Sequence, residues 1–193
     1  MYVDQSRRLI FIHNPKTAGM SIVRSFGFPS TGVPNKFNHT RPKEAIVWIF
    51  QESWSNYYSF SFARNPWDRI VSLYYFQKSD AYGRLSGMSP SHQRAKSLDF
   101  NDWMDANIET PFKSMWFGIP QAEWHAEVSE VFAFETLDQS LPRIANIFGF
   151  QWDQSRENVT TRPAYRNVFT RPDHIDFIAS LDRDTISRFG YDF

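Results

Sequence analysis

The chain has 193 residues, of which 41% are hydrophobic and 22% are charged, and its formal net charge at neutral pH is zero. This composition is typical of one globular domain, and the balanced charge argues against a nucleic-acid partner held by bulk electrostatics. The absence of cysteine excludes disulfides and thiolate metal sites and fits a reducing compartment.

The first residues, Met1–Arg8, contain no apolar leader segment. No later run approaches the ~20 apolar residues that a membrane-spanning helix needs. We therefore expect a soluble, cytoplasmic protein with no membrane span and no nucleic-acid partner.

The first clear pattern joins an apolar run to a helical period through a short polar loop. Leu9–Ile12 has the length and the branched or aromatic content of a buried parallel strand, and Pro15 ends it because proline cannot donate to a sheet ladder. Lys16–Gly19 follow, and apolar residues then recur at helical spacing through Ser21–Phe26. A strand, a tight loop and a helix direct backbone N–H groups at one place, so this stretch predicts a site for a phosphate-like anion.

The loop differs from the phosphate-binding loop of nucleotide triphosphatases. That loop requires Gly-Lys-Ser/Thr, whereas here Lys16 precedes Gly19. Taken alone, the stretch is also compatible with an ordinary turn between a strand and a helix.

Residues 27–40 are rich in proline, glycine and asparagine and predict a loop. A helix is expected from Pro42 to Ile49, because Pro42 suits a first helical turn and the residues after it are good helix formers.

The stretch Phe60–Phe76 repeats the layout of strand, polar break and helix. Pro66 and Asp68 suit the first turn of the second helix, and Arg64 emerges where the second strand ends. Ser72 lies two turns into this helix. Because the carboxyl ends of parallel strands form the ligand edge of a sheet, both predicted corners are expected to face one site.

The rest of the chain has weaker patterns, so its structure and role are predicted less specifically. Residues 79–99 are polar without a strong period, so we expect a mobile loop, which serves either as a lid or acceptor-binding segment or as a plain surface excursion. The aromatic residues of 110–124 form either a sugar-stacking wall or part of the core. The other expected elements are a helix at Phe100–Ile108, a strand at Val128–Phe134, a helix at Ser140–Phe148 ended by Gly149, a loop at 151–170 and a last helix at Pro172–Phe189 closed by Gly190.

The two corners together resemble a known family. FIHNPKTAGMS, residues 11–21, is similar to the 5′-phosphosulfate loop of carbohydrate-type sulfotransferases, called sulfotransferase family 2, and FARNPWDRIVSLYY, residues 62–75, is similar to their 3′-phosphate motif. The resemblance continues through residues 132–137, Asn158 and the closing residues 188–193, so it covers nearly the whole chain. Two separated motifs in the right order are far more specific than either one alone.

The resemblance implies one sulfotransferase-like domain over residues 1–193. It implies a three-layer, P-loop-like α/β fold, with a mostly parallel central sheet flanked by helices. The implied activity is in-line transfer of a sulfuryl group from 3′-phosphoadenosine 5′-phosphosulfate (PAPS) to a hydroxyl, most simply of a carbohydrate or glycolipid. The implied product is adenosine 3′,5′-bisphosphate. No metal is required, because cations and backbone dipoles can supply the charge.

The resemblance also implies roles for particular residues. Lys16 is expected to stabilise the leaving oxygen, and His39 is expected to be the base that removes the acceptor proton. The expected donor-binding residues are Pro15, Lys16, Thr17, Ala18, Gly19, Met20, Ser21, Arg64, Ser72, Asn158 and Arg162. The other candidates for the base are His13, His92, His125 and Glu44.

Two residues depart from the family pattern: Met20 replaces a usual threonine, and Ala133 stands where an arginine is common. Ala133 leaves open a catalytically degenerate module that binds a nucleotide or a glycan. An ATP-dependent kinase on the same fold is a second alternative, although the sequence lacks its Gly-Lys-Ser/Thr loop. Relatives in the animal Golgi carry a membrane anchor, so the chain is expected to be a microbial, minimal form.

Overall fold

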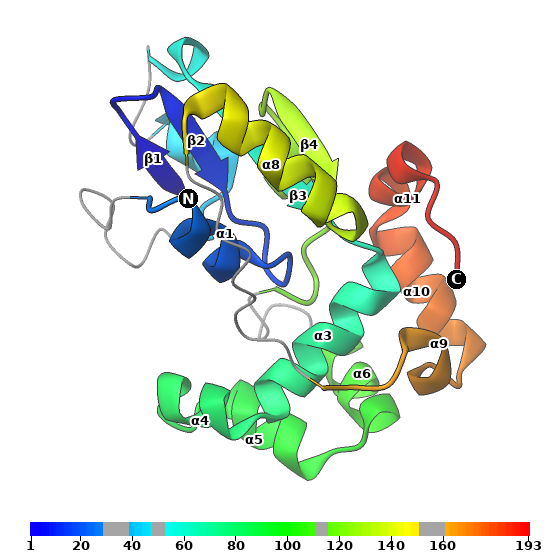
Figure 1. Cartoon of the computed structure of the whole chain (residues 1–193). Coiled ribbons are helices and arrows are strands. Elements are labelled where there is room, and N and C mark those ends of the chain that lie inside the picture. The colour runs from blue at the N-terminus through cyan, green and yellow to red at the C-terminus, as the bar shows by residue number, and fades with distance from the viewer. Residues whose placement is uncertain (29–38, 48–52, 111–115, 151–160) are drawn as a thin grey trace. The chain divides into compact units, whose positions relative to one another are not determined.

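The computed structural model describes residues 1–28, 39–47, 53–110, 116–150 and 161–193 (Figure 1). The chain divides into two compact units. The first, here called the sheet unit, comprises Met1–Arg64 and Gln121–Val159, and the second, the helical unit, comprises Asn65–Pro120 and Thr160–Phe193. No helix in these described ranges is long and apolar enough to cross a bilayer. The single sulfotransferase-like domain over residues 1–193 stays a prediction.

The sheet unit contains a four-stranded sheet in the order β1-β2-β3-β4. The strands are β1 (Tyr2–Asp4), β2 (Leu9–Ile12), β3 (Tyr58–Ala63) and β4 (Glu130–Ala133). β2, β3 and β4 are parallel, whereas β1 runs antiparallel to β2. The expected α/β fold is confirmed, but the sheet is mixed, because the three-residue strand β1 is too short to leave a pattern in the sequence. The P-loop-like, three-layer arrangement stays a prediction.

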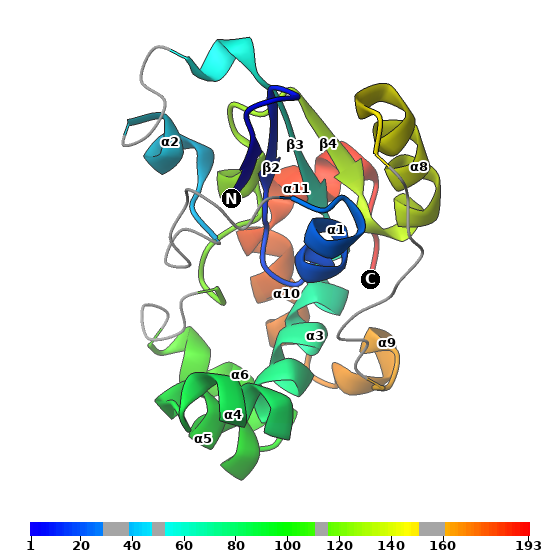
Figure 2. The same cartoon turned by 60° about the vertical axis from the view of Figure 1, so that its left-hand side comes forward.

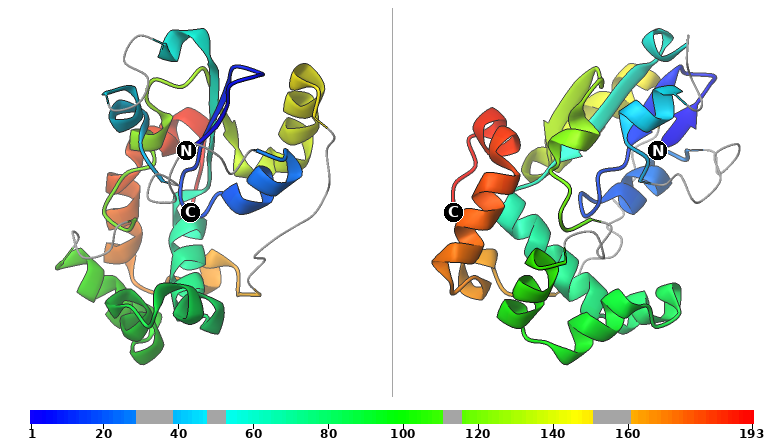
Figure 3. Two further views of the ribbon diagram at one scale, coloured as in Figure 1. Left: turned by 90° about the vertical axis from the view of Figure 1, so that its left-hand side faces the viewer. Right: turned by 180° about the vertical axis from the view of Figure 1, so that it is seen from behind.

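Helices pack on both faces of this sheet. They are α1 (Gly19–Ser25), α2 (Pro42–Ala45), the 3-10 helices η3 (Trp54–Asn56) and η5 (Phe134–Thr136), α7 (Ala122–His125) and α8 (Leu137–Phe148). Within this unit α1 and α8 lie on one face of the sheet and α2 lies on the other (Figures 2 and 3). The expected continuation of α2 to Ile49 cannot be followed beyond residue 47, since residues 48–52 lie outside the described part. Gly149 ends α8 with a φ of 70°, as its position after the helix predicted.

The core of the sheet unit explains why apolar runs in the sequence predicted the strands β2 and β3. Alternate residues of β2 and β3 face α1 and α8, and they include Phe11, Phe60 and Phe62, each fully buried. Each such side chain contributes about 1.5–3 kcal/mol by leaving water. This burial holds β2 beside β3 in the register that pairs Phe11 with Phe60.

The helical unit is built around one long helix, α3 (Pro66–Lys78). Asn65 caps it by accepting a hydrogen bond from the Asp68 amide, and Pro66 and Asp68 occupy its first turn, as predicted. The other helices of the unit are α4 (Asp80–Ser86), α5 (Pro90–Ser97), α6 (Phe100–Ile108), α9 (Tyr165–Val168), α10 (Pro172–Leu181) and α11 (Arg183–Phe189).

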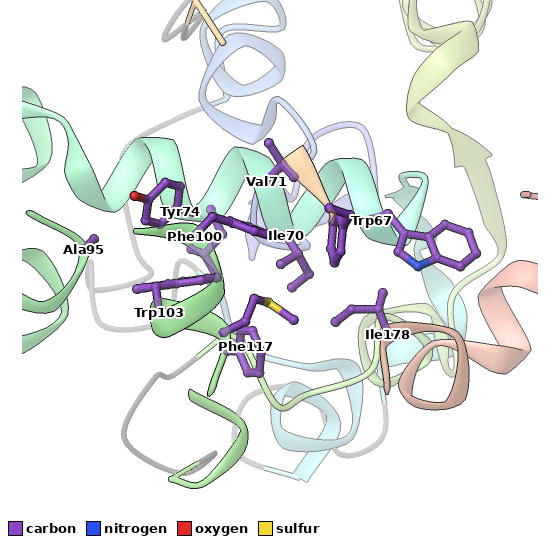
Figure 4. Packing of buried hydrophobic residues seen from close by; sticks show 12 residues of the cluster. Trp67, Ile70, Val71, Tyr74, Ala95, Phe100, Trp103, Phe117 and Ile178 are labelled. Carbon is purple, nitrogen blue, oxygen red and sulfur yellow. The ribbon is translucent and has the colours of Figure 1, made fainter. Parts of the chain in front are cut away.

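The core of the helical unit lies along α3. Figure 4 shows side chains of α3 and of the segments packed against it, among them Trp67, Ile70, Val71, Tyr74, Phe100, Trp103, Phe117 and Ile178. The aromatic residues of 110–124 that the structure describes belong to cores: Phe117 is fully buried here, and Trp124 is 1% exposed in the sheet unit. The core interpretation of these two residues is therefore confirmed, while Phe112 lies outside the described residues.

The expected mobile loop at residues 79–99 is wrong, because this segment forms α4 and α5. Ser79 and Ser89 cap the two helices through their hydroxyls, which accept hydrogen bonds from the Tyr82 and His92 amides. Between the helices Gly87 adopts a φ of 59°. Both helices are short and bury few apolar residues, so they leave little hydrophobic periodicity in the sequence.

The expected single helix at Pro172–Phe189 is also corrected, because it is divided into α10 and α11 at Asp182. The Asp182 carboxylate lies 3.5 Å from the guanidinium of Arg69, and both side chains are fully buried. Removing either partner would leave a charge uncompensated in the core, so this ion pair fixes the chain at the break between the helices.

Candidate active site

The loop between β2 and α1 has an unusual backbone. Lys16 and Ala18 have φ values of 70° and 59°, whereas Thr17 and Gly19 have negative φ. Non-glycine residues rarely adopt positive φ, and two in one short loop indicate stored backbone strain. Alternation of the sign of φ turns successive N–H groups toward one side and forms a concave site for an anion.

The loop is held in this conformation from inside. Thr17 is fully buried, and its hydroxyl donates a hydrogen bond of 2.8 Å to the Asn14 carbonyl. α1 has only seven residues, and no side chain caps its start. The predicted anion site would therefore depend on the backbone of the loop more than on the helix dipole.

Arg64 connects the end of β3 to this loop. Its Nη1 donates a hydrogen bond of 2.8 Å to the Lys16 carbonyl, and its side chain is largely buried. The guanidinium carbon lies 4.1 Å from the centre of the Phe134 ring, which provides a cation–π contact. The residues that follow β2 and β3, two neighbouring parallel strands, are therefore in contact, and both belong to the sheet unit.

The rings of His39 and His13 lie against each other beside the loop, with their centres 4.2 Å apart and their planes tilted by 47°. The Nδ1 atom of His39 lies 3.1 Å from the His13 carbonyl. A carbonyl oxygen can only accept, so Nδ1 carries the hydrogen and Nε2 keeps the lone pair. The ring is therefore held in the tautomer that could accept a proton at Nε2.

Burial dominates the electrostatics of the two histidines. It lowers the pKa of His39 to about 4, and the positive charge of Lys16 acts in the same direction. Burial also lowers the pKa of His13 well below its usual value, with smaller contributions from His39 and Lys16. Both rings are therefore neutral at pH 7.

A model of the sulfotransferase family matches residues 1–185. The chain belongs to this family. The match confirms the resemblance to sulfotransferase family 2 that the two corner motifs indicated. No curated protein and no solved structure matched the chain. Family membership makes the chain a transferase, with sulfuryl transfer to a hydroxyl-bearing acceptor as its general chemistry.

The site of this sulfotransferase contains three residues that sequence reasoning did not identify: Asn14, Gln121 and Phe134. Asn14 is fully buried and donates hydrogen bonds of 2.9 Å to the Phe62 carbonyl and 3.0 Å to Gln121 Oε1. In the sequence, Asn14 and Phe134 fall inside the motifs 11–21 and 132–137, which predict no separate role for either residue. No signal in the sequence distinguished Gln121, because its partners are distant in the chain.

The remaining residues of the predicted donor loop differ in exposure. Met20 is 37% exposed, whereas Ser21 is largely buried on α1. Pro15 is buried, and Ala18 and Lys16 are partly exposed. Their assignment to donor binding stays a prediction.

Three predicted donor-binding residues lie outside the described sheet unit. Ser72 is largely buried on α3 in the helical unit. Arg162, in the same unit, forms an ion pair of 2.7 Å with Asp68. Asn158 lies outside the described residues. Each role stays a prediction.

The alternatives to His39 as the base have other partners. His92 lies in the helical unit, with its Nδ1 atom 2.8 Å from the Gln77 carbonyl. The Nε2 atom of His125 lies 3.4 Å from Asn14 Nδ2. Burial tends to raise the pKa of Glu44, but hydrogen bonds from Arg41 outweigh it and hold the pKa below its usual value. The assignment of the base to His39, rather than to one of these groups or to His13, stays a prediction.

Metal ligands show no grouping in the part of the chain that the structure describes: no three His, Cys, Asp or Glu side chains lie close enough together to hold an ion. Whether the reaction proceeds without a metal stays a prediction.

Gly19 is required by the buried ring of His13. A Cβ atom at Gly19 would lie 1.9 Å from both Cδ2 and Nε2 of His13. The His13 ring packs against Phe11 and His39, so it has little room to withdraw. Gly19→Ala is therefore expected to lower the free energy of unfolding by about 1–3 kcal/mol, measured by chemical denaturation.

Two further variants test this explanation. In a His13→Ala background the same substitution at Gly19 should cost much less, because the clashing ring is gone. Gly27→Asn serves as the control, since a Cβ there meets nothing within 4 Å and asparagine tolerates its φ of 57°. An equal cost of Gly19→Ala with and without the imidazole would contradict the packing argument.

Proposed function

We propose that this sulfotransferase moves the sulfuryl group of PAPS to a hydroxyl of a carbohydrate or glycolipid. The observation that carries the proposal is the hydrogen bond from Arg64 to the Lys16 carbonyl, which brings a guanidinium against a loop of alternating φ. This combination suits a ligand with two anionic ends, because backbone N–H groups and a planar guanidinium both favour phosphate.

The residues present fit such a donor. The backbone of the loop would hold the 5′-phosphosulfate, and Arg64 would favour the 3′-phosphate, the group that distinguishes this donor from ATP. Ser72, Asn158 and Arg162 are assigned to donor binding by family resemblance alone. When bound, the donor supplies the sulfuryl group, and its 5′-phosphate oxygen keeps the electron pair of the broken S–O bond.

Lys16 and His39 would divide the remaining work. The Lys16 ammonium stabilises the negative charge that develops on the leaving oxygen. The acceptor oxygen forms the new bond to sulfur as its proton passes to Nε2 of His39, whose Nδ1–H is held by the His13 carbonyl. The neutral state of His39 at pH 7 leaves this lone pair available.

Ligand binding tests the donor assignment. Adenosine 3′,5′-bisphosphate without magnesium is expected to raise the melting temperature by roughly 5–10 °C at a hundredfold excess over its Kd. ADP, which lacks the 3′-phosphate, is the matched control and should stabilise less. A preference for ATP with magnesium would indicate a kinase and would overturn the proposal.

Turnover tests the activity itself. The protein should transfer ³⁵S-labelled sulfate from PAPS to at least one member of a broad carbohydrate and glycolipid panel. Tight binding of the bisphosphate with no transfer to any acceptor would instead support a degenerate binding module.

A further inference from the structure

We propose that the segment Gln121–His125, which lies outside both corner motifs, positions two reactive groups of the site: Gln121 sets Arg64, and Trp124 sets His39. The inference rests on the proposed function and extends it to residues outside the predicted set of donor-binding and catalytic residues. It begins from the observation that this one short segment, Gln121 with α7, makes hydrogen bonds to Asn14 just after β2, to Arg64 just after β3 and to His39, the residue proposed as the base.

Gln121 binds the backbone of Arg64 as a neighbouring strand would. Its Oε1 accepts from the Arg64 amide at 3.0 Å, and its Nε2 donates to the Arg64 carbonyl at 2.8 Å. The same Oε1 accepts from Asn14 Nδ2 at 3.0 Å. The Gln121 side chain is fully buried, so water cannot replace these bonds.

The consequence is that one carboxamide ties together the ends of β2 and β3. β3 ends at Ala63, so Arg64 is the first residue beyond the ladder. By pairing both its N–H and its C=O, Gln121 fixes the direction in which the Arg64 side chain leaves the sheet. That side chain is the one that meets the Lys16 carbonyl.

Trp124 acts in the same way on His39. Its indole Nε1 donates a hydrogen bond of 3.0 Å to the His39 carbonyl, and the indole is 1% exposed. The His39 ring is oriented separately by the His13 carbonyl. A hydrogen bond from Trp124 therefore holds the backbone of the proposed base, and a hydrogen bond to the corner loop holds its ring.

Glu123 adds a third connection from the same segment. Its carboxylate pairs with Arg41 at 3.3 Å and with Lys43. Both cations stand at the start of α2, just after His39 in the chain. These contacts hold the segment that follows His39. Their partly exposed positions make them weaker than the hydrogen bonds of Gln121 and Trp124.

The two positions predict different kinetic effects. Gln121→Met removes the carboxamide at similar length, and it is expected to raise the KM for PAPS about tenfold with kcat changed less than threefold, because Arg64 is misplaced. Trp124→Phe removes the N–H while keeping an aromatic ring, and it is expected to lower kcat about tenfold with the KM for PAPS unchanged.

Two matched control variants lose an indole N–H or a carboxamide at positions outside the segment Gln121–His125. Trp54→Phe removes an indole N–H that donates to the Glu127 carbonyl at 2.8 Å, and Gln93→Met removes an exposed carboxamide that donates to the Met88 carbonyl at 2.9 Å. Both controls should keep the kinetic parameters of the wild type. If Gln121→Met does not fold, Gln121→Glu replaces it, because the carboxylate keeps an acceptor for the Arg64 amide. If Trp124→Phe does not fold, Trp124→His replaces it, because histidine keeps a ring N–H.

The split between KM and kcat decides the proposal. Supporting it requires the opposite pattern in the two variants, together with a change in the His39 imidazole resonances of Trp124→Phe in NMR spectra. Parallel loss of both parameters in step with the melting temperature, or no change in either, would overturn it.

Failure of the proposed function gives a different result. If no acceptor is sulfated, the binding constant of adenosine 3′,5′-bisphosphate replaces the kinetic readout. Gln121→Met should still weaken binding about tenfold, and Trp124→Phe should leave binding unchanged. Equal binding by wild type and Gln121→Met would then reject the positioning role on its own evidence.

Discussion

Replacing Lys16 with alanine is expected to lower kcat about 100- to 1,000-fold, the loss typical of removing one group that stabilises charge in a transition state. The ammonium stands on a loop whose backbone conformation is fixed by the buried Thr17 and by Arg64. The backbone that carries this positive charge therefore needs no rearrangement when negative charge develops on the leaving oxygen. The KM for PAPS should change far less than kcat.

The measurement is the initial rate of ³⁵S-sulfate transfer to the best acceptor of the panel. Lys96→Ala is the matched control, because Lys96 is an exposed lysine of the helical unit that pairs with Asp80. It should retain the wild-type rate. A Lys16→Ala variant with kcat within threefold of the wild type would show that the leaving oxygen is stabilised by another group.

The Lys16 charge also affects the proposed base. Because this charge contributes to the lowered pKa of His39, Lys16→Ala should raise that pKa. During the reaction, negative charge on the leaving oxygen would offset the ammonium in the same way. The basicity of His39 would then increase at the moment when the acceptor proton is transferred.

His39→Gln is expected to lower kcat by about 100- to 10,000-fold, the range for loss of a general base. Glutamine keeps a polar group near the His13 carbonyl but has no basic lone pair of comparable strength. His174→Gln is the control, since His174 is a buried histidine of the helical unit whose Nε2 lies 2.8 Å from Asp105. A full rate in His39→Gln would move the assignment to another base candidate.

The pH dependence provides a second test of His39. A base must be neutral to accept a proton, and burial lowers the pKa of this imidazole to about 4. The kcat/KM of the wild type should therefore stay level from pH 8 down to about pH 5 and fall only as the pH approaches 4. An acidic limb near pH 6.5, the value of an unperturbed histidine, would contradict the buried, neutral state.

Acidification should also destabilise the protein through the same group. The folded state holds His39 at a pKa below that of the unfolded chain, so the unfolded state binds more protons below about pH 6.5. Rates at low pH are therefore best taken from short assays after a pH jump, with the folded fraction checked by circular dichroism.

The sequence by itself determined the family and the two β-to-α corners. Buried strands such as Leu9–Ile12 need contiguous apolar residues, and helix starts such as Asn65-Pro66 need particular cap residues. Such features depend on residues within a few positions of one another, so short stretches of sequence are enough to predict them. The loop between Pro15 and Gly19 could be predicted as an anion site for the same reason, and that role stays a prediction.

Local sequence patterns do not predict every helix, as α4 and α5 illustrate. Their short helices are stabilised by serine caps and by packing on α3, and packing partners cannot be read from a polar stretch. Asp182 divides the last predicted helix because it faces Arg69, a residue 113 positions away in the chain.

Only the tertiary structure decided how the site is held. Gln121 meets Arg64 across 57 positions, and Trp124 meets His39 across 85. Hydrogen bonds of this kind form between surfaces that folding brings together, and the sequence around each partner carries no trace of the other. The residues proposed for the site could therefore be chosen from the sequence alone, whereas the orientation of Arg64 and His39 depends on long-range contacts that exist only in the folded chain.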